Sequence, residues 1–264
     1  MRSKGVGGRA RQASPRALAI GGGVALVIVI AIVLAVVLGS GGGGSSQVVS
    51  AGDLQGLPAT GNANSQIALP GAPDANNLFK GIPQKGLVLG DPKAPVTMEM
   101  FIDVQCPVCQ DYEVLHLPGV VKKYIADGKV QLHLQPWAFL GSQSFTGRYG
   151  VIAAADQNKG FEYAKVLYDN QGTEETGWLT GKEMAAIAAS VNGLNLAQWM
   201  DDVNSSATKS AASTVDKLAT QKNVTGTPTI LVGPTGGKLQ VATGGSGYNP
   251  TGVDQALAAA VANS

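Results

Sequence analysis

The two cysteines of this 264-residue chain stand close together, as Cys106-Pro107-Val108-Cys109. Two thiols three positions apart can close into a small disulfide ring and open again by thiolate exchange. A disulfide framework that stabilises a fold would need more cysteines at wider spacing, because cross-links stabilise mainly by closing long loops. The pair therefore indicates redox chemistry on the thiols of another molecule.

The residues around the pair predict a strand that leads into a helix. Val96–Val104 is mostly apolar and follows Pro95, which is typical of a buried strand. A helix is predicted from Cys106 to about Asp127, with Pro107 in its first turn. The unpaired N–H groups at a helix start favour a thiolate, and in such motifs they lower a thiol pKa to about 3.5–7.5.

The spacing of the cysteines also assigns them different roles. Cys109 falls on the same helical face as Cys106 and is expected to turn inward. We therefore expect Cys106 to be the sulfur that attacks or is attacked, and Cys109 to be the sulfur that resolves a mixed disulfide.

The rest of the chain predicts an α/β sandwich with a helical insertion at about residues 141–222. Val130–Gln135 alternates with period two, which predicts a second strand. Two short strands and an Ala-rich helix close the chain. The predicted helices are Ser144–Gln157, Phe161–Asn170, Gly181–Val191, Leu196–Gln221 and about Thr251–Asn263, and the late strands are Thr229–Val232 and Lys238–Ala242.

The N-terminal residues predict a membrane anchor. Residues 1–16 carry five basic side chains, and Leu18–Leu38 is a run of 21 uncharged residues, about the ~20 that a helix needs to cross a bilayer. This asymmetry keeps the N-terminus in the cytoplasm. We expect a single-pass signal-anchor at residues 17–39, with the cysteines in an extracytoplasmic compartment where disulfides persist. Cleavage of a signal peptide near Gly39 is the alternative, although such apolar regions usually span about 7–15 residues.

A flexible linker is predicted between the anchor and the folded domain. Residues 40–84 are rich in Gly, Ser, Pro and Asn, a composition that buries too little apolar surface to offset backbone entropy. Residues 85–264 are then enough for one well-buried domain.

The charge balance excludes nucleic acid as a partner. The chain has 19 basic and 18 acidic residues, and five of the basic ones precede the apolar run, which leaves 14 basic against 18 acidic in the exported part. The sequence has no basic patch interleaved with aromatic residues.

A zinc site is disfavoured as well. The Cys pair would need His116 and His133, which are 17 residues apart, unlike the short spacing of compact Cys₂His₂ sites. We expect no metal, and each histidine is expected at the surface or half-buried.

With these motifs the sequence resembles the DsbA-like thioredoxin-fold oxidoreductases of bacterial envelopes. Phe101–Cys109 (FIDVQCPVC) looks like the family's strand-to-helix active-site segment, and Val224–Thr229 (VTGTPT) looks like its cis-proline loop. The resemblance covers about residues 85–262. It implies a thioredoxin fold with an inserted helical domain.

The resemblance also implies roles for Thr227 and Pro228. A cis bond before Pro228 would face that residue toward the Cys pair, and Thr227 would leave backbone groups free to pair with an extended peptide. An ordinary turn before an edge strand is the alternative.

Two departures from the family pattern bear on the direction of electron flow. Val108 stands where strongly oxidising members often have His, and it cannot donate a side-chain hydrogen bond to a thiolate. Met100 stands where these proteins often carry a buried acid that assists proton transfer to the resolving thiol. Glu99 is expected on the other face of the strand, and Asp103 is expected to hydrogen-bond the turn at the strand end.

Three classes of function remain open. The first is a membrane-tethered thiol:disulfide oxidoreductase that oxidises exported thiol-containing proteins. The resemblance then implies re-oxidation by a quinone-linked membrane partner of the DsbB or vitamin-K-epoxide-reductase (VKOR) type. The second is a reductase or isomerase of the same fold, and the third is a non-enzymatic peptide-binding module with a static disulfide. No organic cofactor is expected, because the dithiol itself carries two electrons.

Overall fold

The computed structural model describes residues 47–244 and 247–264. The predicted cytoplasmic segment, the anchor at residues 17–39 and residues 40–46 of the predicted linker lie outside the described residues. Within those described ranges, no helix combines the length and the apolar character that crossing a bilayer requires.

A six-stranded sheet forms the centre of the described part, in the order β1-β2-β4-β3-β5-β6. β3 runs parallel to β4, and the other neighbouring pairs are antiparallel. The strands are β1 (Gln84–Lys85), β2 (Val88–Leu89), β3 (Val96–Ile102), β4 (Val130–Pro136), β5 (Thr229–Pro234) and β6 (Gln240–Gly244). β3 is buried along its whole length, as its apolar sequence predicts.

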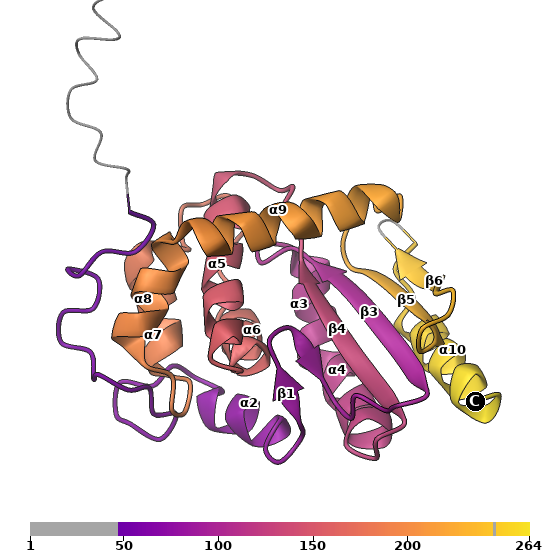
Figure 1. Cartoon of the computed structure of the whole chain (residues 1–264). Coiled ribbons are helices and arrows are strands. Elements are labelled where there is room, and N and C mark those ends of the chain that lie inside the picture. The colour runs from indigo at the N-terminus through magenta and orange to yellow at the C-terminus, as the bar shows by residue number, and fades with distance from the viewer. Residues whose placement is uncertain (1–46, 245–246) are drawn as a thin grey trace, which may run out of the picture. The chain divides into compact units, whose positions relative to one another are not determined.

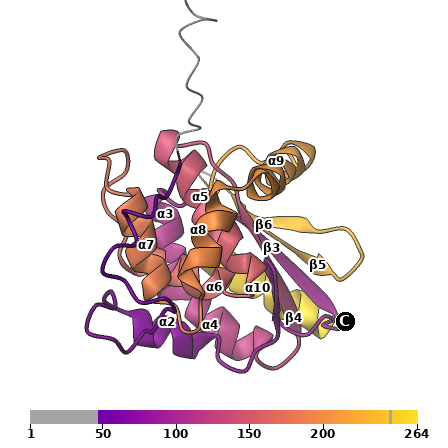
Figure 2. The same ribbon diagram turned by 60° about the vertical axis from the view of Figure 1, so that its left-hand side comes forward.

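Helices cover both faces of this sheet (Figures 1 and 2). On one face Met98, Met100 and Ile102 join the main core with the helical segment after β3 and with α10 (Pro250–Ala262). On the other face Phe101 packs in a smaller cluster with residues at the end of α9 (Ser206–Gln221). In Figure 1, α9 runs along the top from α8 to the sheet.

The helical segment after β3 runs from Pro107 to Ile125 and changes its winding on the way. It consists of α3 (Pro107–Asp111), the π-helical turn η1 (Tyr112–His116), α4 (Leu117–Val120) and a second π-helical turn η2 (Val121–Ile125). Pro118 lies in the first turn of α4, where its missing N–H is tolerated.

The predicted helical insertion is present as five helices. They are α5 (Ser142–Asp156), α6 (Gly160–Asp169), α7 (Gly181–Ala189), α8 (Leu196–Asn204) and α9. The prediction of one helix over 196–221 is wrong. Ser205 has extended backbone angles, and its hydroxyl accepts from the Thr208 N–H, so it ends α8 and caps α9.

The prediction of a flexible linker up to residue 84 is also wrong for residues 47–84. Val49 and Phe79 are buried, and α2 (Ala72–Leu78) packs on α6. The Gly61 N–H donates to the Leu194 oxygen at 2.9 Å. Residues 47–83, which we call the strap, therefore belong to the folded unit, because their backbone groups bond to the helical insertion.

Candidate active site

Cys106 caps the helix that follows β3. Its backbone is extended, its Sγ accepts a hydrogen bond from the Cys109 N–H at 3.4 Å, and Pro107 occupies the first helical turn. The pKa of Cys106 is lowered from 9.0 to about 6, mainly by a hydrogen bond with the Cys109 side chain. Burial opposes this shift, and the Thr227 side chain and the backbone N–H groups of Cys109 and Val108 add to the lowering. Cys106 is thus an ionised nucleophile at neutral pH.

Cys109 has the opposite electrostatic environment. It is 0 % exposed, whereas Cys106 is 4 % exposed. Burial raises the pKa of Cys109 well above its usual value, and the neighbouring Cys106 adds to that rise. Both sulfurs are free thiols here. Both sulfurs are thus buried, but the lowered pKa of Cys106 favours its thiolate, and the raised pKa of Cys109 favours its thiol.

The Thr227–Pro228 loop lies against Cys106. The peptide bond between these two residues is cis, and the Cys106 thiol donates to the Thr227 backbone oxygen at 3.4 Å. The Thr227 hydroxyl is buried without a well-formed hydrogen bond among the described residues. It is free to turn toward a thiolate, and it lowers the pKa of both cysteines.

The layer beneath the pair is apolar. Met100 on β3 is the register partner of Leu134 on β4, and both are buried. Glu99 lies on the opposite face, as predicted, where its carboxylate is 2.8 Å from Lys222 Nζ at the end of α9. No acid from these strand positions is therefore available to Cys109. Val108 is only partly buried beside the pair.

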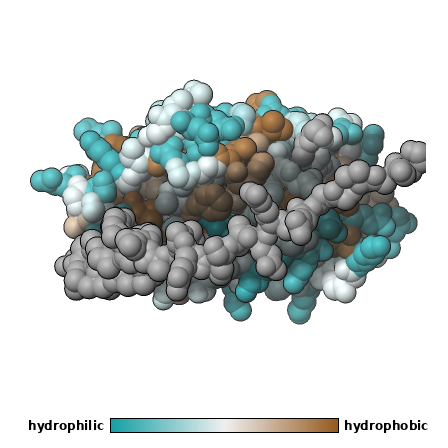
Figure 3. All heavy atoms as spheres, turned by 90° about the horizontal axis from the view of Figure 1, so that it is seen from above, coloured by the Kyte–Doolittle hydropathy of each residue, from teal (hydrophilic) through white to brown (hydrophobic). Residues whose placement is uncertain are grey.

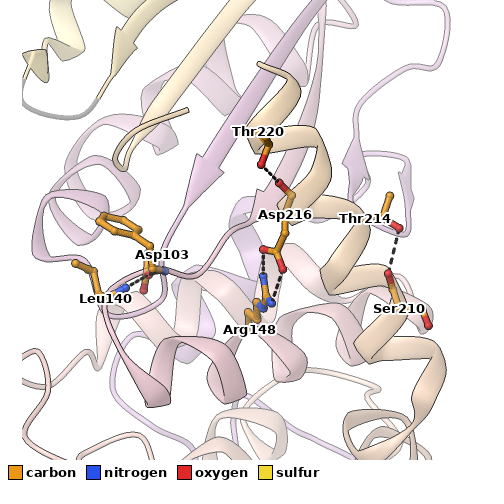
Figure 4. Close-up of polar contacts among 8 residues, drawn as sticks. Asp103, Leu140, Arg148, Ser210, Thr214, Asp216 and Thr220 are labelled. Atoms are coloured by element: carbon orange, nitrogen blue, oxygen red, sulfur yellow. Dashed lines mark hydrogen bonds and ion pairs between the residues drawn. The ribbon is translucent and has the colours of Figure 1, made fainter. Parts of the chain in front are cut away.

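Asp103 fastens the turn before Cys106 to the helical insertion. Its carboxylate accepts from the Gln105, Phe139 and Leu140 N–H groups and from the Ser144 hydroxyl, at 2.6–3.1 Å. Figure 4 shows Asp103 beside Leu140. The predicted turn hydrogen bond is confirmed, and the three longer-range bonds were not predicted. One buried carboxylate thus fixes the position of the whole active-site turn.

An ion pair further along the insertion is visible in the same view. Arg148 on α5 binds Asp216 on α9 through two hydrogen bonds of 2.6 and 3.0 Å (Figure 4). Arg148 is buried, so this bidentate pair joins the two helices firmly.

The end of α6 also holds the active-site turn, through residues that the sequence analysis missed. The Tyr168 hydroxyl donates to the backbone oxygen of Asp103 at 2.9 Å. Gln110 Nε2 donates to the backbone oxygen of Tyr168, also at 2.9 Å. Gln171 Nε2 donates to the Val104 oxygen at 2.9 Å and to the Cys106 oxygen at 3.4 Å. Tyr168 and Gln171 are more than 60 residues from the active-site turn in the sequence, so no local pattern indicates that they contact it.

A buried acid lies four residues beyond Cys109. Burial raises the pKa of Glu113 to about 8, Lys165 opposes this rise, and Asp169 adds to it. Lys165 and Asp169 form an ion pair on α6. The sequence analysis did not single out Glu113, since a lone acid in a helical segment carries no signal that it is buried.

The two histidines have other partners than the cysteines. His116 Nε2 is 3.5 Å from Asp111 Oδ2, and His133 Nε2 is 3.0 Å from Gln131 Oε1. Burial lowers the pKa of His133. Among the described residues, no group of three or more potential metal-binding side chains comes together.

Known proteins with similar sequences and structures agree with this architecture. A protein-family model described as thioredoxin matches residues 83–238. The chain is 28 % identical over 160 residues to "Probable disulfide bond formation protein D" of Bacillus cereus, which is 60 % of this chain and 73 % of that protein.

Solved structures share the fold. BdbD from Bacillus subtilis, in its oxidised form, has a TM-score of 0.58 and 20 % identity, over 69 % of this chain and 97 % of that one. Chlamydia trachomatis DsbA has a TM-score of 0.56 and 18 % identity, over 66 % and 90 % of the two chains. At these identities the likeness establishes the fold alone.

Proposed function

Because the chain belongs to the thioredoxin family, whose model matches residues 83–238, we propose that it oxidises the thiols of exported proteins with a Cys106–Cys109 disulfide. The chain is a thiol:disulfide oxidoreductase, in keeping with its relatives among disulfide bond formation proteins. The observation that carries the direction of transfer is the pKa of Cys106, which is lowered to about 6. A stabilised thiolate is a good leaving group, so it favours donation of the disulfide.

The proposed reaction proceeds in two exchanges. A substrate thiolate attacks Cys106 Sγ, the Cys106–Cys109 bond breaks, and Cys109 leaves and takes up a proton. A second substrate thiolate then attacks the substrate sulfur of the mixed disulfide and releases Cys106 as a thiolate. Two substrate thiols become one disulfide, and the Cys pair gains their two electrons.

The proposal includes the cellular setting. A single-pass anchor at residues 17–39 would hold the catalytic domain outside the cytoplasm, and an oxidant of the quinone class, delivered by a membrane protein of the DsbB or VKOR type, would restore the disulfide. No bound cofactor or metal takes part in the proposed reaction. The charge asymmetry of the N-terminal residues and the Cys pair support this setting.

The assignment of Cys106 as the sulfur that exchanges with substrates is tested by trapping. With Cys109→Ser, the Cys106 thiolate can still attack a disulfide of a cellular protein, and no Cys109 thiol is present to cleave the resulting mixed disulfide, so complexes should accumulate on non-reducing gels. With Cys106→Ser the remaining thiol is buried, and no complexes should form. Complexes in the second variant and none in the first would refute the assignment.

A reductase or isomerase is the second candidate. The apolar layer of Met100 and Leu134 and the presence of Val108 favour it, because none of these side chains donates a hydrogen bond to a thiolate.

A further inference from the structure

A pocket of about 440 Å³ lies beside the residue that precedes Cys106. It is lined by Gln105, Ser142, Gln143, Glu175 and Gly177. Gln105 and Cys106 are consecutive, so their Cα atoms are about 3.8 Å apart. The pocket is therefore lined by the residue directly before the reactive cysteine, on the side of the active-site turn that faces the start of α5.

Gln105 is held so that its amide nitrogen has no partner. The side chain is 1 % exposed, and its Oε1 accepts from the Glu175 N–H at 3.1 Å, which fixes the orientation of the amide. The Nε2 atom is buried and has no hydrogen-bond acceptor in the described part of the chain. A buried donor without an acceptor is destabilising, so an acceptor from a ligand would be stabilising.

Gln143 supplies the complementary group. Its Oε1 atom is also buried and lacks a donor among the residues of the described ranges. Gln143 lies in the first turn of α5, a helix whose N-cap, Gly141, provides no side-chain hydrogen bond. One wall of the pocket thus offers a donor and another offers an acceptor.

The backbone of the pocket is constrained to keep this arrangement. Glu175 has a φ of 56°, in the left-handed region that non-glycine residues rarely occupy. Gly141 has a φ of 128°, a backbone conformation that other residues rarely adopt, so glycine is favoured at this position. Residues in such conformations persist where the surrounding structure holds them, often at binding sites.

Two exposed aromatic side chains lie within three residues of Ser142 in the sequence. Phe139 is 42 % exposed and stacks on Trp137 with ring centroids 4.9 Å apart, and Phe145 is 45 % exposed on α5. Seen from above, the described part shows apolar areas among hydrophilic residues (Figure 3). Apolar rims beside unpaired polar groups are typical of surfaces that bind an extended polypeptide.

We propose that this pocket is a subsite that binds one peptide group of the substrate polypeptide near its reacting cysteine. Gln105 Nε2 would donate to the peptide carbonyl, and Gln143 Oε1 would accept from a peptide N–H. A peptide group fits because the pocket offers one donor and one acceptor, and because the Glu175 carboxylate disfavours an anion. The subsite rests on the proposed function, and it lies on residues other than the Thr227–Pro228 loop.

The test uses the oxidised full-length chain in mild detergent and a synthetic cysteine peptide. A matched series carries one N-methylated backbone amide at a time, within three residues of the cysteine on either side. Methylation removes the peptide N–H from which Gln143 Oε1 would accept a hydrogen bond. At one position, the rate of disulfide transfer to the peptide should fall about three- to tenfold, as expected for one lost hydrogen bond.

The variants show whether Gln143 is responsible. Gln143→Ala should transfer more slowly to the unmodified peptide and should lose most of the sensitivity to that methylation. Gln221→Ala, an exposed glutamine at the end of α9, should behave like the unchanged chain. Gln105→Glu keeps the oxygen that accepts from Glu175 but replaces the donor, so transfer should again fall about three- to tenfold. Circular dichroism confirms that each variant is folded.

Two results would overturn the proposal, and they differ. In the first, each methylation changes the rate of disulfide transfer by the same factor for the unchanged chain and for Gln143→Ala. The pocket then holds only solvent, so the subsite is refuted while the oxidase function stands. If the oxidised chain transfers no disulfide to the unmodified peptide, the proposed function itself fails, and the subsite fails with it.

Discussion

Cys106 Sγ lies 3.4 Å from the backbone oxygen of Thr227, the residue whose bond to Pro228 is cis. In the thiol form Cys106 donates to this oxygen, and in the thiolate form the Thr227 hydroxyl can donate to the sulfur. The second contact lowers the pKa of Cys106. The loop is therefore part of what makes Cys106 reactive, in addition to any contact it makes with a substrate.

Replacement of the hydroxyl by a methyl group isolates this effect. Thr227→Val keeps the shape of the side chain and should raise the pKa of Cys106, because the thiolate loses a donor. The rate of alkylation of Cys106 by iodoacetamide at pH 5.5 should fall about three- to tenfold. Thr225→Val, on the exposed part of the same loop, is the control. An unchanged rate for Thr227→Val would contradict the contact.

The pKa of Cys106 also sets how the reduced protein responds to pH. Folding lowers this pKa from 9.0 to about 6, so the stabilisation is complete above pH 9 and is lost as the pH falls through about 6. The disulfide form has no thiol to titrate. On going from pH 8 to pH 5, the reduced chain should lose stability relative to the oxidised chain.

Thermal unfolding of both forms at the two pH values measures this difference. All other groups titrate in both forms, so subtraction leaves the contribution of the cysteines. Cys106→Ser has neither the disulfide nor a Cys106 thiol to titrate, so its own unfolding should lack the extra loss of stability that the reduced chain shows between pH 8 and pH 5. A difference that stays constant between pH 5 and pH 8 would show that Cys106 is not ionised in the folded chain.

Asp103 should be important for stability because four donors share its carboxylate. Asp103→Ala should lower the free energy of unfolding by roughly 3–5 kcal/mol, since buried N–H groups lose their acceptor. Ser144→Ala removes one of the four donors and should cost about 1 kcal/mol. Urea unfolding of the two variants gives the comparison. Equal losses would mean that the backbone donors find other partners.

The strap is expected to stabilise the helical insertion. Asn204 at the end of α8 accepts from the Val48 N–H and donates to the Val49 oxygen, both at 2.7 Å. Asn204→Ala should destabilise the chain by about 1–2 kcal/mol and should speed proteolytic cleavage near residues 47–60. Gln198→Ala, exposed on the same helix, is the control. Equally rapid cleavage of all three proteins would support the flexible linker that the sequence predicted.

The sequence predicted the elements that have regular patterns. The apolar run of β3, the alternation of β4 and the proline in the active-site helix each carry a local signal, and the structure contains all three elements. The strap carries no such signal, because its backbone groups bond to loops more than 100 residues away. Its Gly- and Asn-rich composition is that of a linker until those contacts are known.

The residues of the candidate site also fall into two groups, those that belong to sequence motifs and those that do not. Cys106, Cys109 and Pro228 belong to motifs with a fixed spacing, so they were found from the sequence. The sequence does not single out Gln105, Gln143 and Gln171. Their surroundings come from segments that are distant in the sequence, and a lone glutamine has no motif that would identify it. The break between α8 and α9 had a visible signal, since Asn204 and Ser205 are residues that favour helix ends.

The direction of electron flow is the central claim, and the reduction potential of the Cys106–Cys109 pair tests it most directly. The full-length chain is equilibrated with glutathione redox buffers, and the fraction of disulfide is measured by alkylation and mass spectrometry. The lowered pKa of Cys106 predicts a potential between about −120 and −180 mV, in the range of disulfide donors. A value at or below about −270 mV, that of thioredoxin, would contradict an oxidase and favour a reductase.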